Sequence, residues 1–209
     1  MILTLLHTAD VHCATFDALG ARIAPKAKFT HHVRADWLER AQGGVDDALR
    51  AEIAQVIAAA PGPVLCTCTT LGPQAAEAGA LRIDAPMMQA AAGIAAQAQG
   101  SILMAYCLPS TLAPSAALLD AALEAQGYKA RVHALSLAQF WPLFDAGEHE
   151  AFAAVIATAI RENLSAVPKA ACVVLAQASM AGAAPMLSVL PIPVLASPEM
   201  ALRAALSQA

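Results

Sequence analysis

The alternation of short, β-rich apolar runs with longer Ala/Leu stretches at helical spacing is the feature that most constrains this chain. It is typical of parallel α/β proteins, in which a helix follows each strand. Most of the runs are apolar on both faces, so helices should cover both sides of the sheets. The predicted strands are Ile2–Leu6, Thr30–Arg34, Val64–Thr67, Ser101–Ala105, Lys129–Ala134, Ala171–Ala176 and Ile192–Leu195.

Polar residues mark the beginnings of several helices, where the first turn leaves N–H groups that need a cap. One of these starts has the spacing of a capping box, and the final helix has a proline at its first position. The predicted starts are Gly43-Gly44 with Asp46 and Asp47 for a helix that runs through Ala60, Asp84, Asp145 with Glu148 for a helix over Phe152–Asn163, and Ser197 for the final helix.

Composition and charge exclude several classes of partner. The formal net charge is −4 and the basic residues are scattered, so the chain lacks the basic patch that nucleic-acid binding requires. Its five cysteines are odd in number and mostly lie in apolar runs. Free thiols of this kind indicate a reducing compartment, and we expect a cytoplasmic protein.

The stretch from Ala170 to Pro198 carries no formal charge and raises the question of a membrane span. A spanning helix needs about 20 apolar residues without interruption, whereas this stretch contains helix breakers. A buried strand, a short helix and a second strand explain it better, and the apolar start of the chain lacks the basic leader of a signal peptide. The breakers are Gly182, Pro185, Pro191 and Pro193.

A ligand site of an open parallel sheet lies beyond the carboxyl ends of its strands, next to helix starts. Cys68 falls in such a turn, where a helix dipole would favour its thiolate and lower its pKa. The alternative is a small apolar residue in a tight turn. The pair Cys66 and Cys68 is a weak metal motif because no second pair accompanies it.

His7, His12, His31 and His32 raise the question of a metal site or a general base. His31 and His32 are adjacent on a predicted strand and point to opposite faces, so they cannot both serve one site. His7, at the end of the first strand, is the better candidate for contact with a ligand. We therefore predict no metal site.

Three segments and the opening His7-Thr8 resemble the aspartate/glutamate/hydantoin racemase superfamily in order and spacing over nearly the whole chain. They are VLCTCTT at 64–70, RIDAPM at 82–87 and LAQASM at 175–180. The resemblance implies two similar α/β lobes facing each other across an active-site cleft. Residues 1–98 would form the first lobe, with the final helix 197–209 packed on it, and residues 99–196 the second.

The resemblance also implies a site in which each lobe contributes one cysteine. Cys68 matches the first cysteine, whereas Gln177 stands where the second is expected and should face Cys68 across the cleft. An amide cannot usefully donate or accept a proton near neutral pH, so two-base racemisation is doubtful. The implied substrate contacts are His7, Thr8, Thr69, Thr70, Thr111, Gln177, Ala178 and Ser179.

The function implied is that of a cofactor-independent, isomerase-like enzyme. It would act at the carbon next to the carboxylate of a small acid, with Cys68 as thiolate base or nucleophile. The alternatives are a decarboxylase or other lyase, because one thiol suffices there, and a binding protein without catalysis. No cofactor, metal, nucleic acid or membrane partner is expected, and a homo-oligomer is left open.

Overall fold

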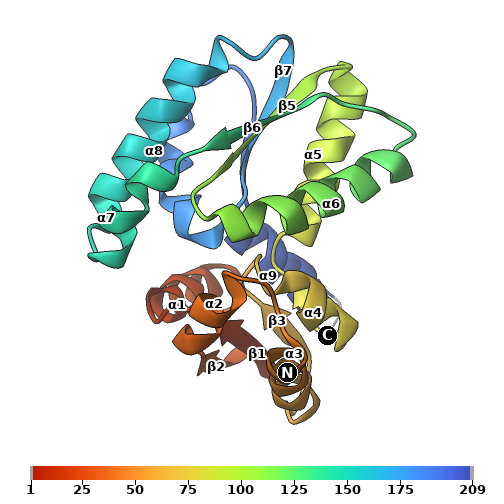
Figure 1. Cartoon of the computed structure of the whole chain (residues 1–209), viewed down its shortest axis with the longest axis vertical. Helices are drawn as coiled ribbons and strands as arrows, with labels where there is room; N and C mark the ends of the chain where they lie inside the picture. The colour runs from red at the N-terminus through yellow and green to blue at the C-terminus, as the bar shows by residue number, and fades with distance from the viewer. Residues whose placement is uncertain (1, 208–209) are drawn as a thin grey trace. The chain divides into compact units, whose positions relative to one another are not determined.

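The computed structural model describes residues 2–207, which form two compact units (Figure 1). One unit contains the chain up to Ala85 together with the segment from Pro198 onward, and the other is Pro86–Ser197. Helix α5 (Ala85–Ala98) therefore groups with the second unit, whereas the sequence analysis set the boundary after residue 98. The reason lies in packing, because the Ala91 carbonyl of α5 lies 4.0 Å from Sγ of Cys172 in the second sheet.

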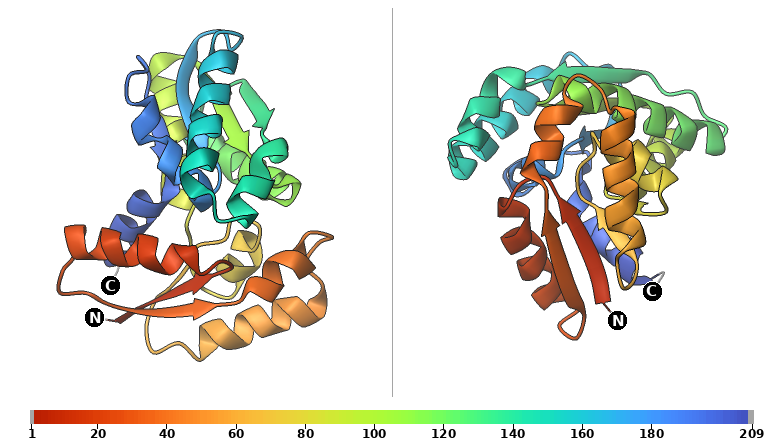
Figure 2. Two further views of the ribbon diagram at one scale, coloured as in Figure 1. Left: turned by 90° about the vertical axis from the view of Figure 1, so that its left-hand side faces the viewer. Right: turned by 60° about the horizontal axis from the view of Figure 1, so that its bottom comes forward.

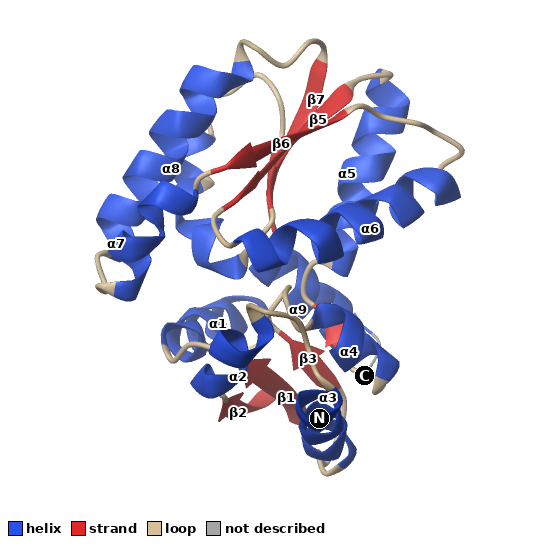
Figure 3. Cartoon of the chain, in the orientation of Figure 1, coloured by secondary structure: helices blue, strands red, loops and turns tan. Residues whose placement is uncertain are grey.

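The first unit holds a parallel sheet with the strand order β2-β1-β3-β4. Helices lie on both sides of this sheet (Figure 3), with α1 on one face and α2 and α3 on the other. The bounds are β1 Ile2–His7, α1 Val11–Ile23, β2 Lys28–Val33, α2 Ala35–Ala41, α3 Asp47–Ala58, β3 Val64–Cys66, α4 Gly72–Glu77 and β4 Leu81–Arg82; α9, Ser197–Ser207, belongs to the same unit.

The second unit repeats this order in a parallel sheet arranged β6-β5-β7-β8. The shared order makes the two lobes similar, and the predicted α/β class is confirmed. The bounds are β5 Ser101–Tyr106, α6 Pro109–Ala125, β6 Val132–Ser136, η1 Ala138–Phe140, α7 Trp141–Asp145, α8 His149–Leu164, β7 Ala170–Leu175, η2 Ala178–Ala183, η3 Pro185–Leu187 and β8 Val194–Ala196, where η marks a 3-10 helix.

The predicted strands all exist, with ends displaced by a few residues at most. Strand β4 was missed because its two residues, Leu81 and Arg82, are too few to show alternation. The uncharged stretch forms β7, two 3-10 helices and β8, close to the prediction. None of the helices within residues 2–207 is long and apolar enough to cross a membrane.

The helix starts agree with the sequence in most places. The carboxylate of Asp46 accepts a hydrogen bond from the Leu49 N–H at 2.7 Å and caps α3. Helices α5 and α9 begin at the predicted positions, although residues 208 and 209 of the predicted final helix lie outside the described part of the chain.

The predicted cap at Asp145 is wrong. Asp145 is the last residue of α7, and α8 begins at His149 with Glu148 as its N-cap residue, which makes no capping hydrogen bond through its side chain. The physical reason is Gly147, whose φ of +79° ends α7 in the left-handed region and separates Asp145 from the next helix.

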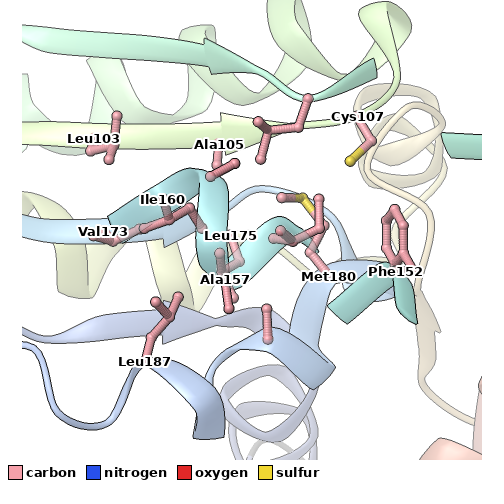
Figure 4. Close-up of a cluster of buried hydrophobic side chains, with 14 of the residues drawn as sticks. Leu103, Ala105, Cys107, Phe152, Ala157, Ile160, Val173, Leu175, Met180 and Leu187 are labelled. Atoms are coloured by element: carbon pink, nitrogen blue, oxygen red, sulfur yellow. The ribbon is translucent and has the colours of Figure 1, made fainter. Parts of the chain in front are cut away.

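Each unit has its own apolar core. In the first, Trp37 of α2 and Leu49 and Ile53 of α3 pack on Leu6 and Cys66. On the other face α1 approaches the sheet closely, because a Cβ at Gly20 would collide with the Phe29 ring. In the second unit, Figure 4 shows side chains of β5, β7 and α8 filling the space between sheet and helix, among them Leu103, Leu175 and Ile160.

Candidate functional site

The turn between β3 and α4 holds Cys68 among hydrogen-bond donors. Cys68 is 8% exposed, and the hydroxyls of Thr8 and Thr70 and the backbone N–H groups of Thr70 and Leu71 act on its sulfur. Donors of this kind stabilise a thiolate in the same way as they stabilise an oxyanion. The structure thus brings together Cys68, Thr8 and Thr70, three residues that the sequence analysis assigned to the site, while Thr69 lies buried beside them.

Burial raises the pKa of the Cys68 thiol above its ordinary value, and the four donors only partly oppose this effect. The prediction of a lowered pKa is therefore wrong. It assumed a helix dipole at the turn, but α4 has six residues and begins at Gly72, followed by Pro73. Such a short helix supplies little dipole, so Cys68 rests as a protonated thiol near neutral pH.

A buried ion pair supports this turn from the neighbouring strand. The guanidinium of Arg82 donates two hydrogen bonds to Asp84, from Nε to Oδ1 at 2.9 Å and from an Nη to Oδ2 at 2.7 Å. The Asp84 side chain is fully buried. A Cβ at Gly72 would lie 2.8 Å from Arg82 Nε, so the start of α4 rests directly on the paired guanidinium.

The equivalent turn of the second unit, after β7, contains Gln177. Its Oε1 accepts hydrogen bonds from the backbone N–H groups of Cys107 at 2.6 Å and Leu108 at 2.9 Å. These N–H groups lie between β5 and α6, and Gln177 is 7% exposed. The amide oxygen therefore occupies a pair of donors that could otherwise hold an anion.

The other residues of this unit that were predicted to contact the substrate are Ala178, Ser179 and Thr111. Ala178 and Ser179 begin η2, which is a 3-10 helix and not the α-helix start that was expected to present N–H groups. Within residues 2–207, Oγ of Ser179 is buried without a hydrogen-bond partner. Thr111 is buried in the first turn of α6.

His7 is fully buried, and both of its ring nitrogens have partners. Nδ1 lies 2.7 Å from Oγ1 of Thr67, and Nε2 lies 2.9 Å from Nδ1 of His31. Burial, followed by the nearby His12 and His31, lowers the pKa of His7 to about 3. The imidazole is thus neutral and fixed in place by its hydrogen bonds.

The remaining cysteines offer less than Cys68 for chemistry. Cys66 lies in the core of β3 as predicted, and burial raises its pKa far above the usual range. Burial also raises the pKa values of Cys107 and Cys172 to about 12. Figure 4 places Cys107 in the apolar cluster beside Met180 and Phe152.

A second cluster of reactive side chains was not predicted from the sequence. Ring nitrogens of His7 and His31 and the sulfur of Cys13 lie within 4.8 Å of one another, and Nε2 of His31 contacts the carboxylate of Asp17 at 3.1 Å. The available signal was the four-residue spacing of Cys13 and Asp17, which puts both on one face of α1.

The predicted opposition of Cys68 and Gln177 concerns residues of different units and stays a prediction. The first turn surrounds a sulfur with hydrogen-bond donors, whereas the second satisfies two donors with its own amide oxygen. The first arrangement can hold or deliver a proton; the second cannot.

Solved structures with the same architecture include racemases and a decarboxylase. Glutamate racemase from Francisella tularensis subsp. tularensis SCHU S4, solved with D-glutamate, is similar with a TM-score of 0.70 and 10% identity over 99% of this chain and 80% of that one. Allantoin racemase from Klebsiella pneumoniae gives 0.62 and 15% over 99% and 86%. An arylmalonate decarboxylase gives 0.54 and 13% over 99% and 92%.

Neither a protein-family model nor a curated protein sequence matches the chain. At identities this low the similarity establishes the fold, and it confirms at that level the resemblance stated from the sequence. The chain has the two-lobe α/β fold of the aspartate/glutamate/hydantoin racemase superfamily.

Proposed function

We propose that this protein is an enzyme that transfers a proton at the carbon next to the carboxylate of a small acid, with Cys68 as the acid/base and without a cofactor. The observation that carries the proposal is the set of four donors around the Cys68 sulfur. Side-chain acid/base groups of this kind typically contribute about 10²–10⁴-fold to a rate. The fold shared with racemases and a decarboxylase supports the same chemistry.

Two reactions fit one thiol in different ways. In an isomerase, a Cys68 thiolate removes the proton on the α-carbon, and the donors around it hold the thiolate and the carboxylate. Exchange of that proton with solvent needs only one base. Inversion needs a proton on the opposite face as well, and Gln177, whose oxygen is held by two N–H groups, cannot supply it.

A decarboxylase is favoured by the protonated state of Cys68. Loss of carbon dioxide from a malonate leaves an enediolate, which requires a proton at carbon and no base to start the reaction. The raised pKa of Cys68 keeps its proton on sulfur until then. The thiol would deliver it to one face of the intermediate, and the resulting thiolate, stabilised by its four donors, would regain a proton from solvent.

The experiment is incubation in D₂O with a panel of α-substituted carboxylates, substituted malonates and unsaturated diacids, followed by proton NMR and chiral chromatography. Exchange of the α-proton identifies the isomerase-like reaction. Release of carbon dioxide with one deuterium placed on a single face identifies the decarboxylase. Cys68→Ala should abolish either activity, whereas Cys172→Ala, a cysteine buried in the second unit, should retain it.

Binding of panel members by calorimetry, with neither exchange nor carbon dioxide release in the unaltered chain, would contradict the proposal and favour a binding protein. Turnover that persists in the Cys68→Ala variant would contradict the assignment of the acid/base. Circular dichroism of both variants verifies that a loss of turnover does not reflect a loss of fold.

A further inference from the structure

The cluster beneath α1 lies on one face of the first sheet. His31 of β2 is paired in register with Leu5 of β1, and His7 is two residues further along the same strand. Because side chains alternate along strands, His7 and His31 share a face. Figure 2 shows α1 running beside β1 and β2, and Cys13 and Asp17 lie one helical turn apart on α1.

The hydrogen bonds around His7 are compatible with either tautomer of its ring. The Thr67 hydroxyl has one hydrogen, which it can donate either to the Leu6 carbonyl at 3.1 Å or to Nδ1 of His7 at 2.7 Å. When the hydroxyl donates to Leu6, Thr67 Oγ1 accepts from Nδ1–H of His7. A neutral His7 then presents a bare lone pair at Nε2.

At His31, the partner of the outer ring nitrogen fixes the position of the proton. Its Nε2 lies 3.1 Å from Oδ1 of Asp17, and a carboxylate can only accept, so Nε2–H is the donor. In the neutral imidazole this leaves a second bare lone pair at Nδ1. With this tautomer of His7 the two lone pairs face each other at 2.9 Å, and a cation between them satisfies both. With the other tautomer, Nε2–H of His7 donates to Nδ1 of His31.

Cys13 completes a donor set for a cation. Its sulfur lies within 4.8 Å of a ring nitrogen of each histidine, whereas ligand atoms around tetrahedral zinc lie roughly 3.5 Å apart given bond lengths of about 2.0–2.3 Å. Cys13 is only partly buried, so its side chain has room to close this gap, and solvent can reach the cluster. Two imidazoles and a thiolate suit zinc-like cations and not magnesium or calcium.

The partners of the outer nitrogens also match a metal site. Histidines that bind metal usually donate their other N–H group to a carboxylate, a carbonyl or a similar acceptor, which fixes the ring. Thr67 does this for His7, and Asp17 does it for His31. Both rings are thus held through their outer nitrogens, and a ring nitrogen of each lies within 4.8 Å of the Cys13 sulfur.

We infer that His7 Nε2, His31 Nδ1 and Cys13 Sγ bind a divalent cation of the zinc class, with solvent as the fourth ligand. On binding, the Cys13 thiol loses its proton to solvent and its sulfur forms the bond to the cation. The bound cation ties the ends of β1 and β2 to α1 and so holds the start of the segment that carries Thr8. It takes no part in the proton transfer proposed for Cys68.

The test is titration of the full-length chain, stripped of metal with a chelator, with Co²⁺ and with Zn²⁺ in competition. We expect one ion per chain, the visible absorption of tetrahedral Co²⁺ and a thiolate-to-cobalt charge-transfer band. Cys13→Ser should remove that band, and His31→Gln should remove most of the affinity. Asp17→Asn, which alters a largely exposed side chain, should weaken binding about 10–100-fold.

His32→Gln is the matched control, because His32 neighbours His31 on the exposed side of β2, and it should bind Co²⁺ like the unaltered chain. Circular dichroism establishes whether each variant is folded. If another variant does not fold, the comparison of Asp17→Asn with the unaltered chain still tests the inference. Absence of Co²⁺ and Zn²⁺ binding, as expected if Nε2–H of His7 donates to His31 instead, overturns the inference. Equal binding by Asp17→Asn and His32→Gln, or a charge-transfer band that survives Cys13→Ser, also overturns it.

Discussion

The turn after β3 and the turn after β7 occupy equivalent places in two sheets with the same strand order, but they use their polar groups differently. In the first, side-chain and backbone donors converge on the sulfur of Cys68. In the second, the oxygen of Gln177 is itself the group on which two backbone donors converge. The ion pair of Arg82 and Asp84 stabilises the first turn, and the side chain of Gln177 stabilises the second.

This difference indicates how one fold can direct its donors at a thiol in one lobe and satisfy them with an amide in the other. A turn that leaves its donors directed at a thiol needs another source of rigidity, which Arg82 and Asp84 supply. A turn that satisfies its donors internally is rigid without help but has no acid or base to offer. Variants that remove these hydrogen-bonding groups one at a time should have effects that decrease from Asp84 through Gln177 to Thr8.

Asp84→Ala should destabilise the first unit by about 3–5 kcal/mol, because it leaves the Arg82 guanidinium largely buried without its counter-charge. The start of α4 rests on that guanidinium at Gly72, so the Cys68 turn should loosen as well. Chemical denaturation gives the free energy of unfolding, and hydrogen exchange at residues 67–72 reports the turn.

Asp36→Ala is the matched control for this prediction. Asp36 also lies two residues after an arginine and accepts two hydrogen bonds from it, both at 3.2 Å, but its side chain is 52% exposed. Exposed pairs contribute little, so this variant should be much less affected. Equal losses in the two variants would show that burial of Asp84 does not decide the strength of the support.

Gln177→Ala should destabilise the second unit by about 2–4 kcal/mol, because it leaves the buried N–H groups of Cys107 and Leu108 without an acceptor. Gln177→Glu keeps an oxygen in place and should lose less. Formate, a small carboxylate, should raise the melting temperature of Gln177→Ala more than that of the unaltered chain by occupying the vacated donors. A Gln177→Ala variant as stable as the unaltered chain would remove the structural role assigned to the amide.

Much of the fold followed from local sequence. Short β-rich runs of four to six residues between helical stretches identified the strands other than β4, and the charge-free segment from Ala170 was correctly divided by its prolines. The misplaced cap at Asp145 shows the limit of pattern matching, because a glycine in the left-handed region at Gly147 decided where the helix ended.

The candidate site was only partly predictable for a different reason. The sequence places Cys68 two residues before Thr70, and the resemblance added Thr8. The pKa of the thiol, however, depends on burial and on the length of α4, which local sequence does not determine. The contacts of Gln177 join residues about 70 positions apart. Likewise, Cys13, His31 and Asp17 meet only because α1 folds over β1 and β2.

Thr8→Val, which replaces one hydroxyl donor to the Cys68 sulfur by a methyl group of similar size, should produce the smallest effect. A hydrogen bond to a charged group contributes about 1.5–3 kcal/mol, so its loss should raise the already elevated pKa of Cys68 further. Since the thiolate is the reactive form, iodoacetamide labelling of Cys68, followed by peptide mass spectrometry, should require a correspondingly higher pH. Thr4→Val is the matched control, because Oγ1 of Thr4 is buried without a hydrogen-bond partner in the described chain; it should leave the profile unchanged. A profile that moves equally in both variants, or in neither, would mean that the Thr8 hydroxyl does not stabilise the thiolate.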